Sequence, residues 1–287
     1  ISSTGHLILL NEFITLNVSD EFRSMFDVVI QLGAILAVIV LFFHKLNPFS
    51  PSKTGDERRS TWRLWGMVVI GCLPAAVFGF ALDDFMNEHF YNKVTVAAML
   101  IVYGVAFIVL ERRNRRRLRE AEAALAAPRG RHARQSYGDV ADEAEAQLFK
   151  IIDVDEIDWK TSLKIGCFQM LAIIPGTSRS GSTIIGGMLC GCSRTAAAEF
   201  TFFLAIPVMF GWGVLKLIKY LMAVGLAMTA TEIAVLVVGI VTAFVVSVIS
   251  IKFLMGYIKK NDFTAFGVYR IIVGLVVLAY FGVKVLL

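Results

Sequence analysis

Cysteine, histidine and proline are scarce in this chain of 287 residues, which contains 4 Cys, 4 His and 6 Pro. The cysteines form no pair of CxxC units, which excludes a structural zinc site of that type. Charge is also sparse, at 18% of residues against 57% hydrophobic ones. Several apolar runs approach or exceed the roughly 20 residues that span a bilayer, which excludes an ordinary soluble core. The composition predicts an all-α, polytopic membrane protein.

The charges that are present lie between the apolar runs. Basic residues cluster after residue 44, between 112 and 119, and after residue 251, which predicts that these connections are cytoplasmic. An acidic loop, 83–89, is predicted to face outside. Arginines beside a membrane indicate topology or contacts with anionic bilayer lipids rather than a nucleic-acid partner. The predicted crossings are 27–44, 64–82, 94–110, 199–216 (broken by Pro207), 232–251 and 266–287.

The polar segment between the two groups of crossings divides the chain into three parts. Residues 1–110 form a first half, 111–160 a cytoplasmic polar insert, and 161–287 a second half. Because the insert is rich in charge and poor in apolar residues, we expect a helix extension followed by a flexible stretch.

A hydroxyl-rich stretch interrupts the second half, running Pro175-Gly176-Thr177-Ser178-Arg179-Ser180-Gly181-Ser182-Thr183. The apolar runs on either side, 162–174 and 182–192, are each too short to span about 30 Å of hydrocarbon. We predict two half-helices, the second beginning near Ser180 to Thr183, where free N–H groups attract an anion. A Pro-Gly kink would be the simpler reading without Arg179. An arginine within the membrane costs about 2.5 kcal/mol or more, however, and indicates a functional site.

A similar stretch, Ser2-Ser3-Thr4-Gly5-His6, precedes a short apolar run at the start of the chain. Three predicted crossings follow each stretch, and the charge pattern makes the first enter from outside and the second from inside. Two re-entrant helix pairs in an inverted-topology repeat, with tips that meet near the midplane, are therefore predicted beside about six transmembrane helices.

These motifs resemble those of the bacterial undecaprenyl-pyrophosphate phosphatase family, also called the bacitracin-resistance family. The resemblance runs essentially end to end and rests on four segments of this sequence: 1–7, 26–33, 175–181 and 199–207. It implies an integral-membrane hydrolase that converts undecaprenyl pyrophosphate to undecaprenyl phosphate and inorganic phosphate. This reaction recycles the lipid carrier for peptidoglycan synthesis and gives bacitracin resistance.

The resemblance also assigns roles to individual residues. The implied catalytic residues are Ser3, His6 and Arg179, and the implied substrate-binding residues are Ser2, Thr4, Gly5, Gln169, Gly176, Thr177, Ser178, Ser180, Gly181 and Thr183. The acidic E/QxxxE motif of the family is absent from this chain, so the carboxylates for the implied divalent cation, Mg²⁺ or Ca²⁺, are expected on a further short segment ahead of Ile1. Either Ser3 or His6 would be the nucleophile, or would orient a water.

A transporter or flippase of a prenyl-phosphate lipid is the alternative, because inverted repeats and broken helices are typical of transporters. We expect the protein in the bacterial inner (plasma) membrane, with the active site open to the periplasm or outside. A homodimer is a further expectation.

Overall fold

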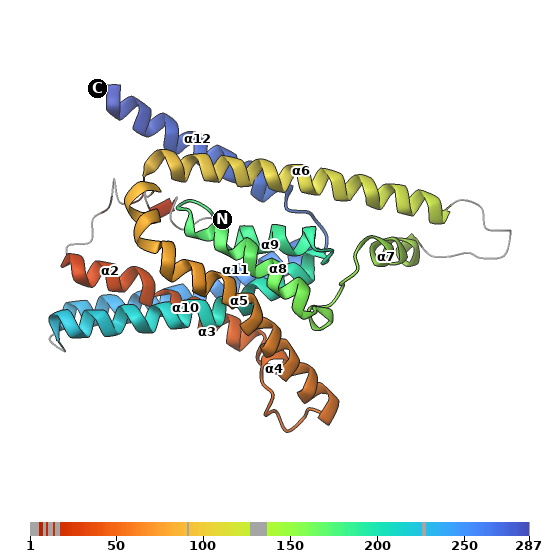
Figure 1. Cartoon of the computed structure of the whole chain (residues 1–287), viewed down its shortest axis with the longest axis horizontal. Coiled ribbons are helices and arrows are strands. Elements are labelled where there is room, and N and C mark those ends of the chain that lie inside the picture. Colours follow the sequence, from red (N-terminus) through yellow and green to blue (C-terminus); the bar gives the residue numbers. More distant parts are fainter. Residues whose placement is uncertain are drawn as a thin grey trace.

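The computed structural model describes residues 6, 7, 10, 14, 18–90, 92–126, 137–225 and 228–286. Within these residues the fold is all α-helical, as predicted (Figure 1). The helices are α2 (Asp20–Val29), α3 (Gln31–Leu41), α4 (Phe43–Leu46), α5 (Gly55–Phe90), α6 (Lys93–Ala126), α7 (Tyr137–Leu148), η1 (Val154–Glu156), α8 (Trp159–Met170), η2 (Leu171–Ile173), α9 (Arg179–Leu189), α10 (Arg194–Val224), α11 (Ala230–Ile258) and α12 (Thr264–Leu286).

Six stretches of the described chain are long and apolar enough to cross a membrane, which confirms the predicted number. They are Glu21–Leu41, Gly55–Gly79, Lys93–Leu125, Arg194–Val224, Ala230–Ile258 and Thr264–Val283. α6 runs beside α12 along the upper edge of Figure 1, and α3 packs against both α10 and α11. Large apolar side chains of α11 such as Val238 and Ile249 stay exposed, as suits helices that face lipid.

Three local predictions are corrected by the structure. The first crossing runs over Glu21–Leu41 instead of 27–44, through α2 and α3, and α4 follows it after Phe42. Residues 83–89 belong to the last turns of α5 and form no loop. Pro207 lies inside α10 without ending it. A proline is tolerated there because neighbouring helices can satisfy the backbone group that it leaves without a hydrogen bond.

Ion pairs bring the basic connections close together near the start of α10, a region called the basic end below. Lys45 follows the first crossing, and its ammonium lies 3.0 Å from Asp153 and 3.1 Å from Glu199. At the same end, Arg115 of α6 pairs with Asp262 in the connection between α11 and α12. These ion pairs join segments that are more than a hundred residues apart in sequence.

A buried ion pair lies next to these surface ion pairs. Glu111, fully buried in α6, accepts three hydrogen bonds of 2.8–3.2 Å from the Arg194 guanidinium at the start of α10. It also accepts the backbone N–H of Phe263 at 3.2 Å. Because both partners are satisfied, this charge pair can remain in the interior.

Two short helices, α8 and α9, pack against each other within this frame. They contain 12 and 11 residues, so neither is long enough to cross a bilayer alone. The strand-like segment before α8 meets the end of α9, where the N–H of Lys150 donates to Gly191 at 2.9 Å and that of Ser193 to Ile151 at 2.8 Å. The beginning of α8 and the end of α9 therefore lie at one place, next to the basic end.

Candidate active site

The turn between the two short helices is fixed by one glycine and one serine. Gly176 has φ +88°, and a Cβ there would lie 2.5 Å from the Val96 Cα of α6. Only glycine combines this backbone conformation with so close an approach. Ser178 then caps α9, since its Oγ accepts the Gly181 N–H at 3.2 Å. The helix begins at Arg179, slightly earlier than the predicted range of Ser180 to Thr183.

Arg179 occupies the first position of α9, where free N–H groups and the positive end of the helix dipole favour an anion. The only acceptor that its guanidinium has among the described residues is the Met209 Sδ, 3.9 Å from Nη2. Its Nε and Nη1 atoms are shielded from solvent and donate no hydrogen bond. A guanidinium with so few partners is suited to bind a ligand that supplies acceptors.

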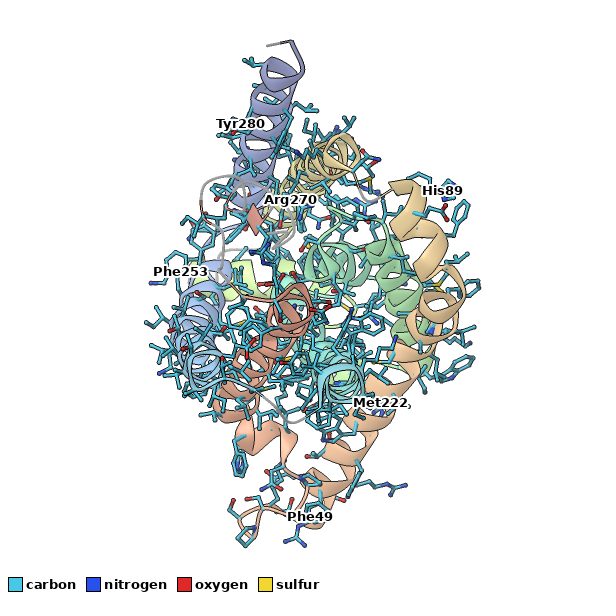
Figure 2. All side chains as sticks on the ribbon, turned by 90° about the vertical axis from the view of Figure 1, so that its left-hand side faces the viewer. Phe49, His89, Met222, Phe253, Arg270 and Tyr280 are labelled. Atoms are coloured by element: carbon cyan, nitrogen blue, oxygen red, sulfur yellow. The ribbon has the colours of Figure 1, made fainter. Side chains whose placement is uncertain are left out.

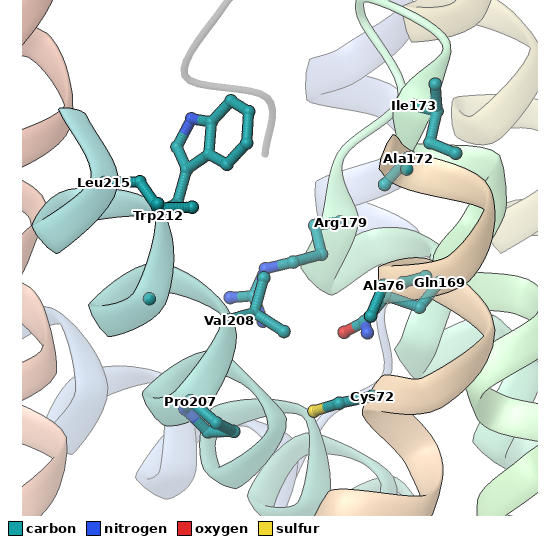
Figure 3. A pocket seen from close by; sticks show the side chains of 13 residues that line it. Cys72, Ala76, Gln169, Ala172, Ile173, Arg179, Pro207, Val208, Trp212 and Leu215 are labelled. Atoms are coloured by element: carbon teal, nitrogen blue, oxygen red, sulfur yellow. The ribbon is translucent and has the colours of Figure 1, made fainter. Parts of the chain in front are cut away.

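A cavity of about 450 Å³ lies beside Arg179 (Figure 3). Its walls come from α5, η2 and α10 and are largely apolar: Cys72, Ala75, Ala76, Gly79, Ala172, Ile173, Pro207, Val208, Gly211, Trp212 and Leu215. Gln169 is the second polar residue in the lining, and both its amide oxygen and its amide nitrogen lack a partner. The cavity thus combines apolar walls with unsatisfied groups that could hold a polar head.

The other predicted residues of the second motif divide into two groups. The Thr177 Oγ1 is buried without a partner, and the Ser180 Oγ lies 3.1 Å from the Ser178 Oγ. These hydroxyls belong to the turn that precedes or opens α9. Thr183 instead donates to carbonyls of its own helix and accepts from Thr201 at 2.9 Å, so its hydroxyl is engaged within the protein.

The first motif is only partly visible, because Ser2, Ser3, Thr4 and Gly5 lie outside the described residues. His6 is described, and its Nε2 lies 2.9 Å from the hydroxyl of Tyr269 on α12. The two rings are stacked, with an interplanar angle of 10°. The structure therefore places the predicted histidine beside α12.

Sequence reasoning missed the next residue of α12, Arg270. Its side chain is only 1% exposed and is the largest of the fully buried side chains among the described residues. Figure 2 labels its position. Its Nη2 donates to the Gly176 carbonyl at 3.4 Å, and its guanidinium lies 5.4 Å from the centre of the Tyr103 ring. The signal in the sequence was a single arginine in the last apolar run. Like Arg179, an arginine within a membrane-spanning segment is costly and indicates a functional site.

The implied divalent cation finds no donor set in the part of the chain that is described. No group of three His, Cys, Asp or Glu side chains there could hold a metal ion. Glu199, the nearest carboxylate that follows the second motif, is paired with Lys45. Binding of Mg²⁺ or Ca²⁺ therefore stays a prediction.

In the described part of the chain, six stretches long enough to span a bilayer, with an arginine-bearing cavity between long and short helices, define a multi-pass α-helical membrane protein. The chain belongs to the bacitracin resistance protein BacA family, whose model matches residues 1–276. It is 51% identical over 280 residues to an undecaprenyl-diphosphatase of Enterococcus faecalis, covering 98% of this chain and 90% of that protein. An undecaprenyl-diphosphatase of Streptococcus thermophilus is 51% identical over 286 residues, covering 100% of this chain and 88% of the relative. An undecaprenyl-diphosphatase of Acetivibrio thermocellus is 50% identical over 281 residues, covering 98% of this chain and 91% of the relative.

Proposed function

We propose that this protein is an undecaprenyl-diphosphatase, which hydrolyses undecaprenyl pyrophosphate to undecaprenyl phosphate and inorganic phosphate. The family and the names of the relatives support this function. The observation within the structure that carries it is the Arg179 guanidinium, which has unpaired N–H groups beside an apolar cavity. The substrate has the matching chemistry, because its diphosphate accepts hydrogen bonds and its isoprenoid chain is apolar.

Arg179 and the first turn of α9 bind the diphosphate in this proposal. Phosphoryl transfer spreads charge over the equatorial oxygens, so positioned cations and N–H groups lower the barrier more than any covalent step by the protein. Arg179 can place two parallel N–H donors on two phosphate oxygens, and Thr177 and Gln169 have polar atoms left to orient the group. The apolar walls of the cavity accept the first part of the isoprenoid chain.

The first motif supplies the attacking group. Ser3 or His6 acts as the nucleophile or activates a water, and the imidazole can accept the proton from the attacking group. The hydrogen bond between His6 and Tyr269 limits the orientation of the imidazole ring. The remaining hydroxyls of this motif, those of Ser2 and Thr4, then bind phosphate oxygens.

We also propose that α8 and α9 form a re-entrant pair in a bacterial inner membrane, with the site open to the outside. Both helices are too short to cross. The segment that leads into α8 meets the segment that follows α9, at residues 150–151 and 191–193. The basic connections lie at that same end, which the distribution of positive charge assigns to the cytoplasm. An inverted repeat would bring the first motif to the turn at Gly176 from the other side.

The test is release of inorganic phosphate from undecaprenyl pyrophosphate by purified protein in detergent. Arg179→Lys keeps the charge but loses the two parallel donors, so we expect a loss of activity of at least tenfold with unchanged thermal stability. Arg116→Gln, on the exposed face of α6, is a matched control that should retain full activity. Turnover by Arg179→Lys close to that of wild type would contradict the assigned role, and no phosphate release by the wild type would contradict the function.

A further inference from the structure

A second arginine, Arg270, is buried in a position where the protein provides little to pair with it. It lies in α12, a helix long and apolar enough to span the membrane, and is 1% exposed. An isolated buried charge is costly, so such groups are normally paired with a carboxylate or fully hydrogen bonded. No carboxylate in the described part of the chain forms an ion pair with Arg270.

The hydrogen bonds of this guanidinium leave most of its donors unused. A guanidinium has five N–H donors. One of the nitrogens of Arg270, Nη2, donates to the Gly176 carbonyl at 3.4 Å, which is a long hydrogen bond. The Nε and Nη1 atoms are buried without any acceptor. The contact with the Tyr103 ring at 5.4 Å offsets only part of the desolvation, because a cation–π contact gives the N–H donors no hydrogen-bond acceptor.

The unused donors lie next to the start of α9. Nη1 is 3.2 Å from the position that a Cβ on Gly181 would occupy, so the guanidinium packs directly on the first turn of this helix. Tyr103, beneath the guanidinium, also lies 3.2 Å from the Ser182 Oγ of the same turn. Arg270 does not line the cavity that contains Arg179. It extends from α12 over the Tyr103 ring of α6 to the first turn of α9.

The same turn of α12 also contacts the first motif. Tyr269, directly before Arg270, holds His6 through its hydroxyl at 2.9 Å. Two consecutive residues of α12 thus contact one residue of the first motif and the turn of the second. A ligand held between the two motifs would lie next to Arg270.

We propose that Arg270 is a second cation for the substrate, which binds the diphosphate together with Arg179 and the first turn of α9. This inference rests on the proposed function, since it names a further ligand of the same anion. The bound diphosphate supplies the acceptors that Nε and Nη1 lack, and two guanidinium groups from different helices can hold both phosphates. The arginine is then stabilised most when substrate is bound.

The experiment compares wild type, Arg270→Gln and Arg270→Lys as full chains in detergent, with Arg116→Gln as the matched control. Binding of inorganic pyrophosphate is measured by calorimetry, and KM and kcat for phosphate release from undecaprenyl pyrophosphate are measured in parallel. We expect Arg270→Gln to weaken pyrophosphate binding and raise KM at least tenfold, and Arg270→Lys to lie in between. A purely structural arginine could be replaced in a protein that still folds without any effect on pyrophosphate binding.

Wild-type pyrophosphate affinity in a folded Arg270→Gln protein would overturn the proposal. If Arg270→Gln does not fold, Arg270→Lys decides: weaker binding supports the proposal and unchanged binding overturns it. If neither variant folds, Arg270 belongs to the fold alone and the proposal is wrong. Because pyrophosphate binding is measured without turnover, a wild type that binds pyrophosphate but releases no phosphate would refute the proposed function and not the role of Arg270.

Discussion

The turn before α9 gives the sharpest prediction about stability, through the substitution Gly176→Ala. Gly176 has φ +88°, and an added Cβ would lie 2.5 Å from the Cα and 2.6 Å from the carbonyl oxygen of Val96. Left-handed backbone costs a residue with a Cβ roughly 1–2 kcal/mol. Overpacking typically adds about 1–3 kcal/mol, and here both contacts are with backbone, which cannot rotate away.

The two contributions together predict a loss of about 2–5 kcal/mol in the free energy of unfolding. Thermal unfolding in detergent measures it, with Gly66→Ala as the control. Gly66 lies inside α5 with no atom within 4 Å of an added Cβ, so the same substitution should stabilise by roughly 0.5–1 kcal/mol. Since Gly176 is three residues before Arg179, phosphate release should fall as well. Equal unfolding temperatures for the two variants would show that the turn is not constrained as described.

Three other predictions concern the basic end of the molecule and the orientation of the chain. Glu111→Leu leaves Arg194 without its buried partner and should lower the free energy of unfolding by roughly 3–5 kcal/mol. The double variant Glu111→Leu/Arg194→Leu should recover part of this loss, and no recovery would contradict the buried ion pair as the cause. Burial tends to raise the pKa of Asp262, but the Thr264 N–H and Arg115 outweigh it and the pKa is lowered. Its stabilising effect is therefore present above the ordinary pKa of an aspartate and is lost as the pH falls through the lowered value; the unfolding temperature of Asp262→Asn should change less than that of wild type below about pH 4. In a cysteine-free background, an impermeant thiol reagent applied to intact cells should label Thr229→Cys and not Ser52→Cys, and the reverse pattern would invert the topology.

The comparison of sequence and structure is most informative at the two buried arginines. Arg179 was identified because it stands in a hydroxyl-rich, glycine-containing stretch between two short apolar runs, which are local features of the chain. Arg270 has no such surroundings in sequence, since it is one arginine in a long apolar run. Its isolation becomes visible only when Gly176, Tyr103 and Gly181, from two other helices and a turn, are placed around it.

The helical class, the six membrane-spanning stretches, the connections that carry the charge and the break at 175–178 could be predicted from the sequence. These follow from hydropathy over about 20 residues, from charge position and from glycine and proline, all of which act locally. The folded protein was needed to show that α10 continues through Pro207, that Glu111 pairs with Arg194, and that His6 lies beside Tyr269. These features depend on contacts between residues distant in the chain, whose energies arise only when the helices pack, so no local pattern contains them.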